Sequence, residues 1–328
     1  MNRTFNGFII GGSPSTGSSL LRQILNRHSS IVCAPETHLF AKPGIVSEWD
    51  QTKFKLAPLL PFKFKDLGLF PFNGLNNQEI PNYKKKKLRE LISKSSNVFS
   101  FFESLMREFF DLELDQVYGE KTPGNVFNFE HILNGSEKFL CVHTVRNPYD
   151  VMASLVARGK SIPMSVAFYL MNTSHVLNVT KSDRVLTIRY ENLVSNPQEE
   201  LSQLLDALQL KFESQMLKPG KSNPNEITKI DSWKYDESEK IQTGSIGRFH
   251  QLDQSVKEEL IAIAWHLRLK GVPAFSNLKE IGEALKYKVH QPKHDLTVKQ
   301  IESLKSFQQS LKNIQPHYKS SNLPFEYS

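Results

Sequence analysis

A glycine-rich loop near the N-terminus constrains the fold of this chain more than any other feature. The apolar run Phe8–Ile10 leads into it, and a helix with an apolar stripe is expected to follow from Ser18 to about Asn26. Two glycines, Gly12 and Gly17, have the spacing of a Walker A loop, in the strand–loop–helix context which that motif requires. Glycines let successive N–H groups point inward, and a helix N-terminus adds partial positive charge. The loop is therefore predicted to bind an anion.

The loop lacks one residue of the Walker A pattern. Ser18 stands where that motif has its lysine. Because this lysine reaches the β- and γ-phosphates in kinases and ATPases, its absence disfavours nucleoside triphosphate chemistry. Taken alone, the loop could equally be an ordinary turn between a strand and a helix.

The rest of the chain has an α/β rhythm. Strands are expected near 31–33, 117–119, 138–143 and 184–189, and helices from Pro148, over about 164–179, from Pro197 and over about 253–268. Strands that alternate with helices predict a parallel sheet covered on both faces. Between them, residues 49–115 are rich in phenylalanine, lysine and proline, which favours an irregular helical insertion, with a helix that opens at Tyr83–Lys87. Near the C-terminus an amphipathic helix follows Thr297, which forms a capping box with Gln300.

Composition narrows the classes of partner. The chain carries 41 Lys and Arg against 34 Asp and Glu, which suits an anionic substrate or a nucleotide. The basic residues are dispersed and no recognition motif appears, so nucleic acid is not an expected partner. No apolar run approaches the roughly 18 residues of a membrane span. Two cysteines are too few for a disulfide framework, so a cytoplasmic location is expected. The sequence has no metal-ligand spacing, so no bound metal is expected.

The segment Gly11–Arg22 resembles the 5′-phosphosulfate loop of sulfotransferases that use 3′-phosphoadenylyl sulfate (PAPS). The resemblance is closest to the branch of protein-tyrosine sulfotransferases and their bacterial relatives. It implies an α/β, P-loop nucleotide-kinase-like fold with five parallel strands in the order 2-3-1-4-5. It also implies that the donor binds to Pro14, Ser15, Thr16, Gly17, Ser18 and Ser19. The family usually carries an arginine where this chain has Ser15.

Three later segments resemble the same family in the same order. Val145–Leu155 is similar to its 3′-phosphate segment and implies that Arg146 and Ser154 bind that group. Arg158 lies four residues after Ser154 on the same helix face and can point at the same anion. Arg189–Leu193 and Thr243–Phe249 are similar to two further nucleotide-binding segments, which adds Tyr190 and Arg248. Considered alone, Arg146 could equally pair with a carboxylate at the end of its strand.

Sulfuryl transfer to a hydroxyl needs a base for the acceptor proton and a cation at the bridging oxygen. Glu36 follows the second expected strand, at the position of the family's catalytic glutamate, and is the predicted general base. His38 is the competing base, or a substrate contact. Lys121 matches the lysine that stabilises the transition state in the family, because it lies in a Lys-x-Pro segment. Ser232 is the nearest match to a serine that the family places near the bridging oxygen.

Together these features predict a single sulfotransferase domain over residues 1–290, with a substrate-side insertion at 49–115. Residues 291–328 are expected to form a helical extension packed on the core. The predicted reaction moves a sulfuryl group from PAPS to a hydroxyl of a tyrosine, a carbohydrate or a small molecule. Two alternatives remain: a P-loop nucleotide kinase and a catalytically silent nucleotide-binding protein. The identity of the acceptor and the oligomeric state do not follow from the sequence.

Overall fold

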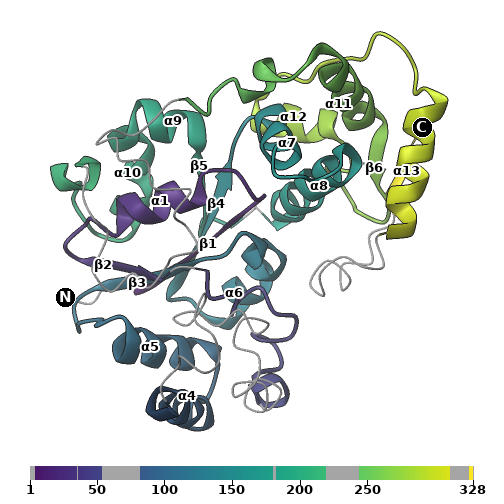
Figure 1. Cartoon of the computed structure of the whole chain (residues 1–328). Helices are drawn as coiled ribbons and strands as arrows, with labels where there is room; N and C mark the ends of the chain where they lie inside the picture. The colour runs from purple at the N-terminus through teal and green to yellow at the C-terminus, as the bar shows by residue number, and fades with distance from the viewer. Residues whose placement is uncertain are drawn as a thin grey trace.

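The computed structural model describes residues 4–34, 36–53, 82–179, 182–218, 244–310 and 325–327. Its centre is a sheet of five parallel strands in the order β2-β3-β1-β4-β5, with helices on both faces (Figure 1). The strands are β1 (Gly7–Gly12), β2 (Ile31–Ala34), β3 (Val117–Lys121), β4 (Phe139–Val145) and β5 (Val185–Arg189). Every residue of β1, β3 and β4 is buried, as expected for parallel strands covered from both sides. The predicted fold class and strand order are confirmed.

The register of the sheet brings the strand ends together. Ala34 pairs with Glu120, Ile10 with Lys121, and Gly12 with Thr144. Because the strands are parallel, their carboxyl ends meet at one edge, where open α/β sheets bind ligands. The loops after β1, β2, β3 and β4 all leave from this edge.

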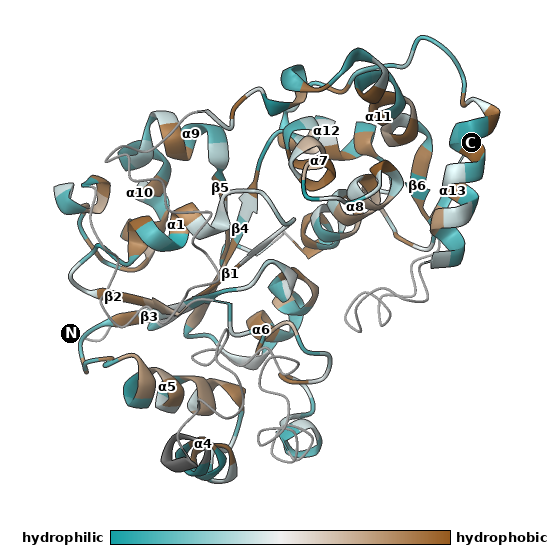
Figure 2. Ribbon diagram, in the orientation of Figure 1, coloured by the Kyte–Doolittle hydropathy of each residue, from teal (hydrophilic) through white to brown (hydrophobic). Residues whose placement is uncertain are grey.

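One face of the sheet is covered by α1 (Ser18–Leu25), α9 (Tyr190–Ser195) and α10 (Pro197–Ala207) (Figure 1). Leu21, Ile24 and Leu204 from these helices pack against Ile10 and Leu140 in one buried cluster. Figure 2 shows β2 in hydrophobic colour along its length, and its side chains alternate between the two buried clusters that lie on either side of the sheet.

The other face is covered by α4 (Asn82–Lys94), α5 (Val98–Phe109), the 3-10 turn η1 (Pro123–Asn128) and α6 (Phe129–Gly135). In the described second half of the segment 49–115, the helix expected to open near Tyr83 is present as α4, and a second helix, α5, which was not predicted from the sequence, follows it. A capping box between Asn97 and Ser100 starts α5, and Phe101 and Phe102 pack in the core against Tyr118 of β3. The apolar stripe of α5 packs this helix against the sheet. Neighbouring polar residues make this stripe hard to recognise in the sequence. Residues 54–81 lie outside the described ranges.

The remaining elements, apart from η2 (Ser214–Leu217), which packs beside α1 through Met216, form a second layer of helices with a two-stranded sheet beyond β4. They are α7 (Pro148–Val156), α8 (Ile162–Val179), η4 (Arg248–Gln251), α11 (Gln254–His266), β6 (Leu267–Leu269), α12 (Leu278–Leu285), α13 (Val298–Ser310) and β7 (Phe325–Tyr327). Leu304 and Phe307 of α13 are buried in the same cluster as α7 and α8. The predicted capping box of α13 is present, since Thr297 N donates to Gln300 Oε1 over 2.9 Å. Among the described helices, none is long and apolar enough to cross a membrane.

Candidate active site

The loop between β1 and α1 takes a conformation that two residues with positive φ define. Gly17 has a φ of 86° and Ser15 a φ of 76°, both in the left-handed region. A Cβ on Gly17 would lie 2.3 Å from Cδ2 of Tyr190, so the ring of Tyr190 requires a glycine here. Ser15 also adopts the left-handed conformation although it carries a side chain. Such a strained backbone is typical of ligand-binding turns.

The hydroxyls of this loop divide into two groups. Thr16 contacts the protein itself: its Oγ1 lies 2.7 Å from the Ser13 carbonyl oxygen and 2.7 Å from Oγ1 of Thr144. By contrast, the Oγ atoms of Ser13 and Ser15 are buried and, within the described ranges, have no hydrogen-bond partner. Buried polar atoms without a partner are uncommon, so these two hydroxyls indicate a place for a polar ligand.

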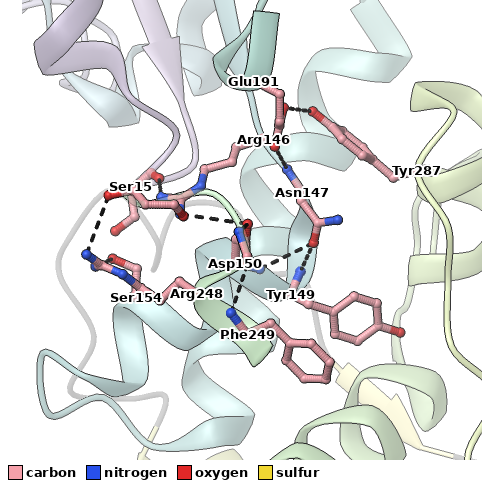
Figure 3. A network of polar contacts seen from close by, with 12 residues as sticks. Ser15, Arg146, Asn147, Tyr149, Asp150, Ser154, Glu191, Arg248, Phe249 and Tyr287 are labelled. Atoms are coloured by element: carbon pink, nitrogen blue, oxygen red, sulfur yellow. Dashed lines mark hydrogen bonds and ion pairs between the residues drawn. The ribbon is translucent and has the colours of Figure 1, made fainter. Parts of the chain in front are cut away.

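Arg146 links three parts of the site (Figure 3). It follows β4, its side chain is 4% exposed, and its guanidinium lies 4.7 Å from the centre of the Tyr190 ring. One guanidinium nitrogen donates to the Ser15 carbonyl over 3.0 Å, and the other donates to the carbonyl of Ser245. The Nε of Arg146 has no partner in the described part of the chain. The arginine therefore connects the first loop to the segment before η4 and keeps N–H groups for a ligand.

Two further guanidiniums lie close to Arg146. Arg248 donates to Oγ of Ser154 over 3.1 Å, which joins η4 to α7. Burial lowers the pKa of Arg158, and the charges of Arg248 and Arg146 lower it further. Burial also lowers the pKa of Arg146, and Arg248 again contributes. A cluster of cations that disfavour one another is stabilised when an anion binds among them.

Asp150 holds this cluster in place from the first turn of α7. Its two carboxylate oxygens accept from the backbone N–H groups of Gly247 and Phe249, each over 2.8 Å, and one oxygen lies 3.9 Å from Arg146 (Figure 3). Asn147 caps the same helix by accepting from Tyr149 N and Asp150 N. The start of α7 thus fixes both Arg146 and the turn that carries Arg248.

Replacing Asp150 with alanine is expected to lower the free energy of unfolding by about 3–5 kcal/mol, because a buried arginine loses its carboxylate. Two backbone donors also lose their acceptor. Urea denaturation measures this change. Asp253→Ala is a matched control, since Asp253 is exposed and its side chain makes no cap hydrogen bond. A loss below about 1 kcal/mol for Asp150→Ala would contradict this role, because ordinary surface substitutions change stability by that little.

A second group of side chains lies at the ends of β2 and β3. Lys121 ends β3 with a side chain that is 2% exposed, and its Nζ donates to Oε1 of Glu36. Glu36 follows β2 and is 32% exposed, so it faces solvent while Lys121 does not. The Nε2 of His38 lies 3.7 Å from the other oxygen of Glu36. Burial lowers the pKa of His38, Glu36 opposes that shift, and Lys121 adds to it. A carboxylate next to an ammonium can exchange protons with a hydroxyl that reaches it from solvent.

The two groups are near enough to interact electrostatically. The charge of Glu36 raises the pKa of Arg158, against the effect of burial. The edge of the sheet therefore carries a cluster of three arginines, which follow β4 and α7 and lie on η4, and a carboxylate–ammonium pair at the ends of β2 and β3. Between them lies the loop after β1.

The sequence of this chain matches the sulfotransferase family over residues 7–214. The chain belongs to the sulfotransferase family. The sulfotransferase is similar in structure to the sulfotransferase domain from the Synechococcus PCC 7002 olefin synthase, with a TM-score of 0.59 and 19% identity over 88% of this chain and 97% of that one. It is also similar to the sulfotransferase domain from the curacin biosynthetic pathway, with a TM-score of 0.52 and 20% identity over 88% of this chain and 100% of that one. Among curated proteins, no match is found.

In this sulfotransferase the structure brings most of the predicted site residues to one edge of the sheet. They are Pro14, Ser15, Thr16, Gly17, Ser18, Ser19, Glu36, His38, Lys121, Arg146, Ser154, Arg158, Tyr190 and Arg248. Ser232 lies outside the described residues. Within the described ranges, no group of three His, Cys, Asp or Glu side chains could hold a metal ion.

Several polar residues of this candidate site were not singled out from the sequence. Glu191 accepts from the backbone N–H of Asn147 and from the Tyr287 hydroxyl, each over 2.8 Å (Figure 3). Glu120 is completely buried beside Lys121. Burial raises the pKa of Glu120 to about 7, while hydrogen bonds from Thr37, Asn125 and Thr122 lower it. A charged residue inside a buried strand is unusual, so Glu120 between Gly119 and Lys121 was the available signal.

Proposed function

We propose that this sulfotransferase moves a sulfuryl group from PAPS to a hydroxyl acceptor, with Glu36 as the general base and Lys121 as the cation at the bridging oxygen. One observation carries the proposal. The Glu36 carboxylate and the Lys121 ammonium are paired at the ends of adjacent strands, on the edge of the sheet that also holds the arginine cluster. A base and a cation side by side are what transfer to a hydroxyl requires.

The residues present fit a donor with two anionic ends. Three guanidiniums and the Ser154 hydroxyl suit a 3′-phosphate, because arginine N–H groups pair with phosphate oxygens in a planar fork. The unpartnered hydroxyls of Ser13 and Ser15 and the N-terminus of α1 suit a 5′-phosphosulfate. PAPS, when bound, would supply the sulfuryl group and a stable bisphosphate as the leaving group.

The side chains at the ends of β2 and β3 have separate roles in the proposed reaction. The Lys121 ammonium favours the carboxylate form of Glu36, which is the form that accepts a proton. The carboxylate of Glu36 takes the proton of the acceptor hydroxyl. The ammonium of Lys121 offsets the negative charge that develops on the bridging oxygen of the donor. His38 is partly exposed beside Glu36 and contacts the acceptor. Acceptors with a tyrosine, carbohydrate or small-molecule hydroxyl fit this chemistry equally.

Binding of nucleotides tests the proposal first. Adenosine 3′,5′-bisphosphate, ADP and ATP are titrated separately into the protein by calorimetry, without magnesium. The bisphosphate is expected to bind at least about tenfold more tightly than ADP, because only it offers a phosphate to the arginine cluster. Equal affinity for the bisphosphate and ADP would contradict the assignment of the cluster, and preference for ATP would favour a nucleotide kinase.

A further inference from the structure

Glu120 is a buried carboxylate at this edge of the sheet that the proposed reaction does not use. It lies in β3 with no exposed surface, next in sequence to Lys121. Three side chains donate hydrogen bonds to it: Thr37 over 2.7 Å, Thr122 over 3.0 Å and Asn125 over 3.0 Å. All three donors are buried as completely as Glu120 itself, with at most 1% exposed.

The two threonines also form hydrogen bonds with the backbone of the loop after β2. Oγ1 of Thr37 accepts from the N–H of Leu39 over 3.1 Å, and Oγ1 of Thr122 accepts from the N–H of His38 over 3.0 Å. Each hydroxyl has a single proton, so accepting from an N–H and donating to Glu120 are compatible only in one orientation. The carboxylate therefore fixes both hydroxyls, and the hydroxyls fix two consecutive N–H groups.

The fixed backbone is the part of the loop where strain is stored. His38 has a φ of 54°, in a region that side chains rarely adopt and that persists only when surrounding contacts hold it. Glu36 lies two residues before this position and His38 faces Glu36 with its ring. The bend at His38 therefore lies two residues from the carboxylate that contacts Lys121.

We propose that Glu120, through the hydroxyls of Thr37 and Thr122, is a positioning device that holds the Glu36 carboxylate against Lys121. It touches neither donor nor acceptor and acts only through the two threonines. This inference rests on the proposed function, because it assigns a purpose to the placement of the proposed base. It makes Thr37, Thr122 and Glu120 one unit, even though they come from two different strand ends.

Threonine variants test this unit more cleanly than a change at Glu120. Removing the carboxylate would leave three buried donors without an acceptor and is expected to destabilise the whole fold. Thr37→Val and Thr122→Val keep the shape but remove the hydroxyl, whereas Thr37→Ser and Thr122→Ser keep the hydroxyl. Thr52→Val is the matched control, since Thr52 is a mostly buried threonine whose hydroxyl donates to the Gly44 carbonyl, away from Glu120.

The expected result is a split between turnover and donor binding. Each valine variant should lower kcat by about 10- to 100-fold, the size of effect that a small misplacement of a catalytic group has. The dissociation constant for adenosine 3′,5′-bisphosphate should stay within about twofold, because the arginine cluster is untouched. The serine variants should recover most of kcat. A valine variant with unchanged kcat, or a serine variant as impaired as its valine partner, would overturn the proposal.

Hydrogen exchange of the peptide that spans residues 36–41 provides a readout independent of activity. The amides of His38 and Leu39 should exchange faster in the valine variants than in wild type, and the peptide around Gly247 should not change. If the wild-type protein transferred no sulfuryl group, the proposed function would fail while this measurement still decided the role of the threonines. Unchanged exchange at residues 36–41 in both valine variants would refute it.

Discussion

Glu36→Gln is expected to lower kcat by about 10²–10⁴-fold, because the amide cannot take the proton of the acceptor hydroxyl. Glutamine keeps the length of the side chain and an oxygen that accepts from Lys121, so the site keeps its shape. The affinity for adenosine 3′,5′-bisphosphate should change little, since the arginine cluster lies on other elements, after β4 and α7 and on η4. Steady-state kinetics and calorimetry on the same preparation measure both quantities.

The control for this substitution is Glu103→Gln. Glu103 is a half-exposed glutamate of α5 that pairs with Arg107, away from the strand ends, and its change should leave kcat as it is. His38→Ala separates the competing base from a substrate contact. It should mainly raise KM for the acceptor and keep the acidic limb of the pH–rate profile. If His38→Ala removed that limb while Glu36→Gln left it intact, the base would be His38.

Arg146→Ala is expected to weaken binding of adenosine 3′,5′-bisphosphate by about 2–5 kcal/mol, because a nearly buried charge partner is lost. Part of this loss of affinity is expected to come from two loops that Arg146 connects. Arg146 donates to carbonyls of both Ser15 and Ser245, so its removal also loosens the contact between the first loop and the segment before η4. Calorimetric titration measures the effect.

Two further variants divide these contributions. Arg146→Lys keeps the charge but not the planar fork, and we expect it to recover only a minor part of the affinity. Arg184→Ala is the matched control, since Arg184 donates to the carbonyls of Leu133 and Ser136 at the far end of the sheet. It should lower stability and leave nucleotide affinity unchanged. Full affinity in Arg146→Ala would show that the 3′-phosphate binds elsewhere.

The sequence predicted the sheet and the first loop well, because both depend on local patterns. The strand order followed from the resemblance that Gly12, Gly17, Arg146 and Lys121 carry together, and the structure confirms it. The helix α5 was missed because its apolar stripe sits among lysines and phenylalanines whose period is hard to separate from an irregular insertion.

The hydrogen bonds that support the site could not be predicted from the sequence, for a different reason. In the sequence, Asp150 stands only near the start of the helix expected from Pro148, whereas in the structure its carboxylate accepts from two N–H groups about a hundred residues further along the chain. Glu120 meets Thr37 across two strands, and its partners become visible only when the register is known. Contacts of this kind depend on tertiary structure, and neither spacing nor propensity encodes them.

Transfer of radiolabelled sulfur from PAPS to a panel of phenols, carbohydrates and tyrosine peptides tests the central claim most directly. Wild-type protein should label at least one hydroxyl acceptor and release adenosine 3′,5′-bisphosphate in equal amount. Glu36→Gln should bind the bisphosphate normally and lose the transfer. Tight binding of the bisphosphate by wild type with no labelled product from any acceptor class would contradict the account and leave a nucleotide-binding protein without sulfuryl transfer.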